Sequence, residues 1–309
     1  MPRPKERRSS LQLDYIKLHR NTRIGYLFVI PSLLVVIFVL VYPVIQAFLY
    51  SLTPEYSENS GWSLENYFNL LDDNRFIESF NNTLIFTFFT IPAELLIGLF
   101  IAVLLNKEFK FRGIVRVAIL FPWALPTALN AIMWRWMFNT EFGVINYGLI
   151  SAGLIENKLN WLGKEPLAMI AMMSVSTWKT SSFMALLLLA GLQTIPKDLY
   201  ESAKIDGAGD FKSFWYITLP LLAPAIIVSL LLRTMDALRV FELPFNLTDG
   251  GPLNTTETIS LYSYRVLFEF VEFNYGSSMV IIPVSYTHLR AHETPEHRGL
   301  RGVGEKKKG

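Results

Sequence analysis

The stretch YESAKIDGAGDFKSFWYITLP, residues 200–220, places charged residues, two glycines and an aromatic run between long apolar segments. Pro196 suits the first turn of a helix, and Gly207 suits the position just after a helix ends. Between these two signals an apolar residue recurs every four positions, at Ile195, Leu199 and Ala203. This spacing predicts a helix of about three turns with one apolar face, ending at a glycine bend.

Two interpretations of this short helix are open from its periodicity alone. It is either an ordinary amphipathic helix lying on the lipid headgroups, or a short helix that projects below the membrane on its glycine bend. In the first case Glu201 pairs with Lys197 or Lys204 on the polar face.

The composition is that of a membrane protein. Hydrophobic residues make up 51% of the chain and charged residues 17%, whereas soluble proteins carry about 25% charged residues. Five apolar windows reach the length of about 20 residues that a helix needs to cross a bilayer. They cover residues 24–52, 84–105, 114–138, 167–192 and 216–238. A sixth run, 275–283, is too short to cross, so we expect an all-α polytopic helix bundle, with a loop over 194–215.

The distribution of lysine and arginine predicts the orientation of this bundle. Residues 1–23 are rich in both, and so is the loop after the second window, whereas the loop after the first window is acidic. Because basic loops stay in the cytoplasm, residues 1–23 and 194–215 are expected inside and 242–272 outside. The first window is too long for a signal peptide and lacks a cleavage site, so we expect it to be retained. Topology explains the basic start, and no nucleic-acid partner is expected.

Polar residues inside the windows are candidates for a substrate path, because polar groups in a membrane favour a cavity or a partner. The candidates are Asn130, Trp134, Ser174, Thr177, Lys179 and Ser181. The same residues also fit structural roles, because hydroxyl groups often join helices and Lys179 can extend its amine to the interface. Arg233 and Asp236 lie three residues apart and predict a local salt bridge, while Glu94 stands isolated in the second window.

The end of the chain, residues 284–309, differs in character from the rest. His288 and His292 would share a helix face and, with Glu293 beside them, suggest a metal site, but Val284–Thr294 resembles, codon for codon, a translated transposase-based sequencing adapter. We therefore expect a non-native tail that truncates the sixth span, and neither a metal site nor a cofactor in this chain. The chain has no cysteine, which excludes disulfide and thiol chemistry. The stretch LTDGGP, residues 247–252, predicts an external turn.

The quoted stretch also carries a family pattern. Glu201, Ala203, Gly207, Ile217, Leu219 and Pro220 match E-A-A, three residues, G, nine residues, I-x-L-P at every spacing, with Ser202 replacing the second alanine. This resembles the cytoplasmic loop of binding-protein-dependent ABC transporter permeases. The flanking sequences over about residues 22–279 resemble carbohydrate-uptake permeases of the maltose or glycerol-3-phosphate type.

The resemblance implies a six-span importer permease fold of the bacterial cytoplasmic (inner) membrane, with residues 24–283 as the permease domain. It implies that the short helix docks on a separate ATPase subunit. The coupling residues would be Glu201, Ser202, Ala203, Asp206, Gly207, Ala208, Ile217, Leu219 and Pro220. The implied partners are a second homologous permease, two ATP-binding subunits with ATP-Mg, an external solute-binding protein and membrane lipid. Residues 247–252 would lie near the surface that receives that external protein.

The sequence offers little for other classes of function. No G-x-x-x-x-G-K-[ST] motif occurs, so this chain has no phosphate-binding loop of its own and is not expected to be an enzyme. A membrane enzyme would also need a nucleophile, base or metal cluster that residues 1–283 do not offer. The alternative is an ion-gradient-driven secondary transporter or a channel. It would need a relay of carboxylates or inverted repeats, and only the isolated Glu94 is available.

Overall fold

The computed structural model describes residues 26–55 and 61–291, with side chains described up to residue 282. Every regular element in these ranges is a helix, as expected for an all-α bundle. The N-terminal segment 1–23 lies outside the described residues, as does the tail from residue 292 onward. The backbone of α14 (Phe273–Ala291) continues beyond residue 283, where the apolar run ends. The adapter interpretation of the tail stays a prediction.

Four helices are long and apolar enough to cross a membrane in the part of the chain that is described, and they coincide with four of the expected windows. They are Tyr26–Ser51, Asn74–Asn106, Glu165–Leu192 and Asp210–Leu238. The first contains a π-helical turn, η1 (Val36–Val41), followed by α2 (Tyr42–Ser51). The second is α4 and the third is α8. The fourth joins α10 (Asp210–Ser213), η2 (Phe214–Thr218) and α11 (Leu219–Leu238).

The expected third span, residues 114–138, is not one straight helix. It divides into α5 (Arg112–Ala124) and α6 (Thr127–Met137), which meet at an angle of 91°. Leu125 between them has an extended backbone, which is the conformation that a following proline, here Pro126, imposes on its neighbour. The bend turns α6 away from the direction of α5, and α6 packs against α12 (Glu242–Leu247).

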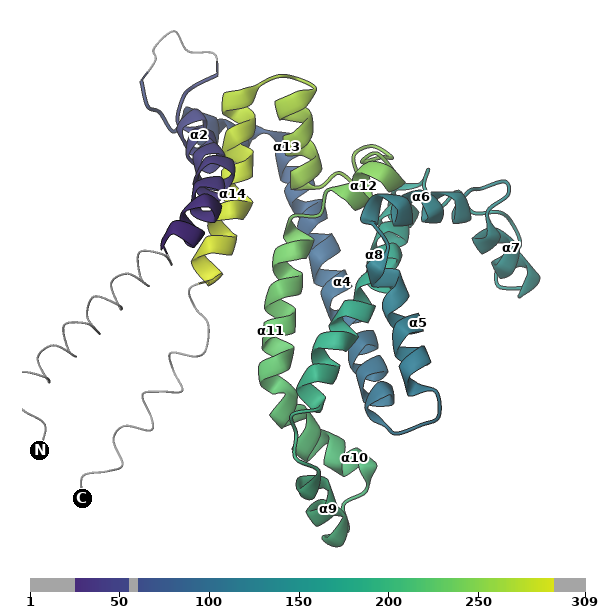
Figure 1. The fold of residues 1–309 in the computed structure, drawn as a ribbon. Coiled ribbons are helices and arrows are strands. Elements are labelled where there is room, and N and C mark those ends of the chain that lie inside the picture. The colour runs from purple at the N-terminus through teal and green to yellow at the C-terminus, as the bar shows by residue number, and fades with distance from the viewer. Residues whose placement is uncertain (1–25, 56–60, 292–309) are drawn as a thin grey trace, which may run out of the picture.

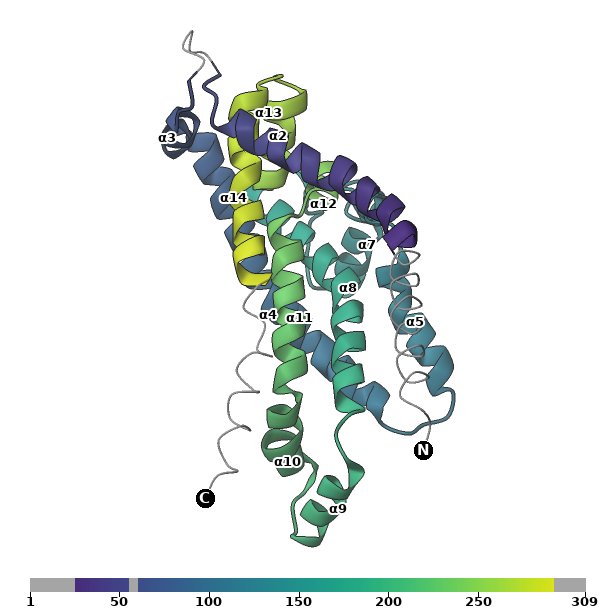
Figure 2. The same cartoon turned by 60° about the vertical axis from the view of Figure 1, so that its left-hand side comes forward.

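The connecting segments gather at two opposite ends of the bundle. Figure 1 shows α9 (Lys197–Ile205) and the α4–α5 connection at one end. At the other end lie α6, α7 (Val144–Ser151), α12 and α13 (Ile259–Phe268). This separation agrees with the charge pattern of the sequence, because the loops expected in the cytoplasm share one end. Figure 2 shows α2 crossing the bundle obliquely, beside α14.

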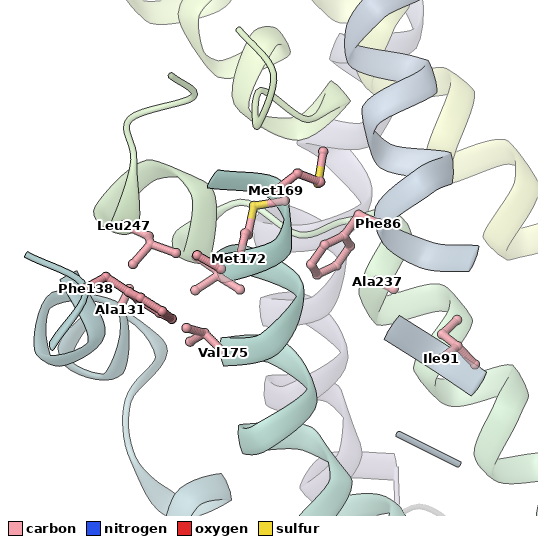
Figure 3. Packing of buried hydrophobic residues seen from close by; sticks show 11 residues of the cluster. Phe86, Ile91, Ala131, Phe138, Met169, Met172, Val175, Ala237 and Leu247 are labelled. Carbon is pink, nitrogen blue, oxygen red and sulfur yellow. The ribbon is translucent and has the colours of Figure 1, made fainter. Parts of the chain in front are cut away.

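Two apolar clusters hold α4, α8 and α11 together. The first lies toward α6 and α12, and Figure 3 shows Met172 and Val175 of α8 with Phe138 on one side and Phe86 on the other. The second lies toward α9 and includes Met184 and Leu188. Small residues allow these helices to approach closely. A Cβ added at Gly98 of α4 would come within 2.7 Å of Met184 Cγ.

A third apolar cluster joins α13 and α14 to α3 (Glu65–Asp72) and to the start of α4. A charged network lies beside it. The fully buried carboxylate of Glu257 accepts hydrogen bonds from Arg75 Nε at 2.7 Å, from Arg75 Nη2 at 2.9 Å and from Arg265. Arg265 also reaches Asp249 at 3.0 Å. These bonds fix residues 247–252, the turn predicted from LTDGGP, onto α4 and α13.

A second carboxylate at this end accepts hydrogen bonds from two phenol groups. Tyr262 and Tyr275 donate to Asp73 Oδ2 at 2.7 and 2.9 Å. Burial raises the pKa of the Tyr262 phenol above its ordinary value, and the hydrogen bond to Asp73 acts in the same direction. Tyr262 therefore remains a hydrogen-bond donor throughout the physiological pH range. The bundle is thus braced at this end by polar contacts, which the apolar windows did not indicate.

Candidate functional site

The loop predicted from the quoted stretch is a short helix that ends on a glycine. α9 spans Lys197–Ile205, one residue after Pro196, which is the N-cap residue and not part of the first turn. Gly207 has a φ of +80°. The N–H of Ala208 donates to the Ala203 carbonyl at 2.8 Å, and the N–H of Gly207 to the Lys204 carbonyl at 3.1 Å. This pair of bonds is a Schellman motif, which favours glycine at the left-handed position.

The helix α9 projects from the bundle and packs against it through Tyr200, which contacts the second apolar cluster. None of its residues is buried, and Leu199 on its apolar face is 43% exposed. Glu201 forms no ion pair with any described residue, whereas Lys197 reaches Glu108 of the α4–α5 connection at 3.3 Å. The pairing of Glu201 with Lys197 or Lys204, which belongs to the interpretation as a helix lying on the headgroups, is therefore absent among the described residues.

The other half of the family pattern lies at the root of α11. Ile217 belongs to η2, and Leu219 and Pro220 are the first two residues of α11. A hydrogen bond of 2.9 Å between the hydroxyls of Tyr200 and Thr218 ties α9 to this root. The helical segment Asp210–Leu238 continues from the loop into the bundle, so this hydrogen bond connects the first half of the pattern to a span. In the first half of the pattern and the bend that follows it, Ala203 and Ala208 are half-buried. The exposed residues are Glu201, Ser202 and Asp206.

A polar hollow of 440 Å³ lies in the part of the bundle where α6, α8, α11 and α12 meet. Its polar and charged lining residues are Thr127, Asn130, Ser176, Lys179, Thr180, Arg233, Asp236, Arg239 and Glu242. Aromatic residues complete it: Phe86, Trp123 and Phe241. Such a mixture of hydrogen-bonding groups and aromatic faces suits a ligand that carries many hydroxyl groups.

Two of the predicted substrate-path residues face this hollow. Asn130 is only 1% exposed, and neither its amide nitrogen nor its carbonyl oxygen has a hydrogen-bond partner in the described part of the chain. Leaving a buried polar group unpaired costs about 1–3 kcal/mol, so this side chain is set up for a ligand or a water. Lys179 donates from Nζ to Thr127 Oγ1 at 2.7 Å.

The remaining predicted residues lie elsewhere. Ser174, Thr177 and Ser181 line a different, mainly apolar hollow of 640 Å³ among α4, α5 and α8. Helical geometry explains the division, because residues three or four apart share one face of α8 and the intervening residues point the other way. Trp134 lines neither hollow and packs edge-on against Trp178, with ring centroids 5.4 Å apart. The predicted substrate path therefore divides between two sides of α8.

A buried ion pair closes the inner wall of the polar hollow. Arg233 of α11 donates to Glu94 of α4, from Nε to Oε2 at 2.8 Å and from Nη2 to Oε1 at 3.1 Å. Glu94 is therefore not isolated. The expected local pair of Arg233 with Asp236 is also present, but its contact is longer, at 3.5 Å. Two charges of opposite sign on separate spans were the sequence signal for the Glu94–Arg233 pair, because a charge inside a membrane favours a partner.

Comparisons with known proteins agree with this architecture. Residues 94–287 match the family model of the binding-protein-dependent transport system inner membrane component. A trehalose/maltose transport system permease of Thermococcus litoralis is 41% identical over 85% of this chain and 90% of its own length. A sulfoquinovosyl glycerol transport system permease of Agrobacterium fabrum is 37% identical over 89% of this chain and 92% of its own length.

The fold also matches a solved structure. One chain of a bacterial alginate ABC transporter, in complex with an alginate pentasaccharide-bound periplasmic protein, superposes with a TM-score of 0.78. The two chains are 22% identical, and the match covers 88% of this chain and 93% of the other. The fold is thus that of an importer permease, as the resemblance implied. This chain belongs to the family of binding-protein-dependent transport system inner membrane components.

Proposed function

We propose that this protein is the membrane permease subunit of an ATP-driven importer that carries a sugar or a sugar derivative. The observation that supports this most directly is the position of α9, an exposed helix at the far end of the two helices, α8 and α11, that flank the polar hollow. A movement of α9 would pass along both helices to the wall of the hollow.

ATP would be hydrolysed by separate ATPase subunits that hold α9 in a surface groove. The exposed apolar side chains of α9 would fill such a groove, and Glu201, free of any intrachain ion pair among the described residues, would meet a basic residue there. An exposed ion pair contributes only about 0.2–1 kcal/mol, so groove packing would supply most of the binding energy. Closure of two ATPase subunits around ATP would then tilt α8 and α11 together as packed rods.

The substrate would pass by the polar hollow. Two relatives with more than a third of their residues identical to this chain are named as permeases for trehalose/maltose and for sulfoquinovosyl glycerol. Asn130 would bond to sugar hydroxyls through its two unpaired groups, and Trp123 would offer an apolar face to a sugar ring. Ser174, Thr177 and Ser181 would have a lesser part, since they face the apolar side of α8.

The remaining partners follow from the exposed surfaces. The first span, Tyr26–Ser51, buries none of its apolar window inside this chain, so lipid or a second permease would cover it. The turn at residues 247–252, braced by Glu257 and Arg265, would form part of a rigid surface for an external solute-binding protein. The end that carries α9 would face the cytoplasm, together with residues 1–23, in the cytoplasmic (inner) membrane.

A secondary transporter would use an intramembrane carboxylate as its proton or sodium carrier. Glu94 is the candidate, but its carboxylate already accepts bonds from Arg233, Ser176 and Thr180. A fully buried carboxylate with three such donors is occupied as an acceptor and shielded from a passing ion, which does not favour a relay.

The test is uptake into vesicles that contain this chain, its partner permease, the ATPase subunits and the binding protein. We expect sugar uptake to require ATP on the side of the membrane that carries the ATPase subunits. Uptake should persist when proton and sodium gradients are collapsed. Uptake driven by either gradient without ATP would contradict the proposal.

A further inference from the structure

Glu94 lies at the centre of a polar layer between the two apolar clusters of the bundle. Its carboxylate is fully buried and accepts four hydrogen bonds, two from Arg233 of α11, one from Ser176 and one from Thr180 of α8. Glu94 does not line the polar hollow, but Arg233, Ser176 and Thr180 all do. Three residues of the hollow wall are therefore held from behind by one side chain.

The charges around the hollow balance only if Glu94 is counted. Three cationic side chains line it, those of Lys179, Arg233 and Arg239, against two anionic ones, those of Asp236 and Glu242. Glu94 supplies the third negative charge through its two-pronged bond to Arg233. Without it the wall would carry a net positive charge.

Glu94 also sets the direction of hydrogen bonding in the wall. Ser176 Oγ donates its proton to Glu94 Oε1 at 3.2 Å. The Ser176 hydroxyl therefore offers only its lone pairs to the hollow. Lone pairs accept from the hydroxyl groups of a sugar, but they repel a carboxylate or a sulfonate, which has no proton to donate.

We propose that Glu94 is a positioning residue that makes the polar hollow selective for an uncharged, hydroxyl-rich sugar over an acidic one. It acts through Arg233 and Ser176, and touches no substrate itself. This inference rests on the proposed function, because it assumes that sugar occupies the hollow during transport.

The test compares two matched ligands. Vesicles with wild-type transporter first identify which of maltose, trehalose and lactose is taken up best with ATP. That disaccharide and its counterpart with one C6 hydroxymethyl group oxidised to a carboxylate are then titrated against the purified permease–ATPase complex. The readout is the ratio of the two dissociation constants, acidic over neutral, in which a general loss of stability cancels.

We expect the wild type to prefer the neutral sugar. Glu94→Gln should lower the ratio about tenfold, because it leaves Arg233 with only its longer contact to Asp236, next to the ligand and in a medium of low effective dielectric. Asp236→Asn, which removes the negative charge of the half-exposed Asp236 side chain beside Arg233, should also lower the ratio. The double variant Glu94→Gln with Arg233→Gln removes both charges and should return the ratio to within about twofold of the wild type.

The possible outcomes are distinct. An unchanged ratio in Glu94→Gln, with both sugars weakened alike, would show that Glu94 is only structural and would overturn the inference. If Glu94→Gln does not assemble, the inference still requires that Asp236→Asn lowers the ratio and that the double variant keeps the wild-type ratio. An unchanged ratio in Asp236→Asn, together with a changed ratio in the double variant, overturns the inference. A wild type that takes up acidic disaccharides with ATP, and none of the neutral ones, also overturns it. Absence of any ATP-driven uptake by the wild type would instead be a failure of the proposed function.

Discussion

Replacement of Gly207 by alanine isolates the contribution of the α9 bend to coupling. Gly207 has a φ of +80°, and a Cβ built on it would meet no atom within 4 Å. The substitution therefore adds no clash. Its cost is the backbone strain of an L-residue in the left-handed region, about 1–2 kcal/mol.

This strain should act on the loop alone. None of the residues of α9 is buried, and its contact with the second apolar cluster, through Tyr200, lies about two helical turns before Gly207. The thermal unfolding temperature of the permease should stay unchanged. The bent loop, however, becomes less populated by a factor of about 5–30, and the affinity for the ATPase subunits should fall by that factor.

The assay is titration of labelled ATPase subunit onto the permease in nanodiscs, followed by substrate-stimulated ATP hydrolysis. Gly209→Ala is the matched control, because Gly209 lies two residues away, has a φ of −75° and also has no atom within 4 Å of an added Cβ. It should behave as the wild type. Equal affinities for the Gly207→Ala and Gly209→Ala variants would refute the role of the glycine bend.

Three further predictions concern the bundle. Glu257→Gln should lower the free energy of unfolding, measured by differential scanning calorimetry, by about 3–5 kcal/mol, because Arg75 and Arg265 lose their buried partner. The control Glu269→Gln changes a side chain that is 49% exposed and should have no such effect. Equal effects of the two variants would contradict a stabilising role of the network. Gly98→Leu should lower the free energy of unfolding by about 1–3 kcal/mol, because the added side chain has no room between α4 and α8. Gly113→Leu, at a position with open space, should leave it unchanged. An unchanged stability of Gly98→Leu would contradict the close contact of α4 and α8. Asn130→Leu should raise the unfolding temperature by removing two unpaired buried groups, but should reduce sugar uptake; unchanged uptake would exclude Asn130 from the path.

Much of the fold was predictable because its signals are local. Long apolar windows identify spans one at a time, and four of the five expected windows each coincide with a single helical segment. The glycine and proline around α9 mark its ends within one residue, since caps depend only on neighbouring backbone. The family pattern around Glu201 then predicted the fold of the remainder, which the superposition on an importer permease confirms.

What the sequence left unpredicted depends on contacts between distant segments. The bend at Pro126 was treated as part of one span because hydrophobicity alone does not record direction. Glu94 and Arg233 are far apart in the chain, and their pairing requires the packing of α4 against α11. The division of the substrate path follows from the rotation of α8, which an apolar helix does not reveal by its pattern.

The most direct test of the account is the side of the membrane on which α9 lies. The chain has no cysteine, so Ser202→Cys on the exposed face of α9 gives a single reactive thiol, and Asp72→Cys at the opposite end gives the control. We predict that a membrane-impermeant maleimide labels position 72 but not position 202 in intact cells. In inside-out vesicles it should label position 202, and added ATPase subunits should protect it. Labelling of position 202 from outside intact cells would contradict the account.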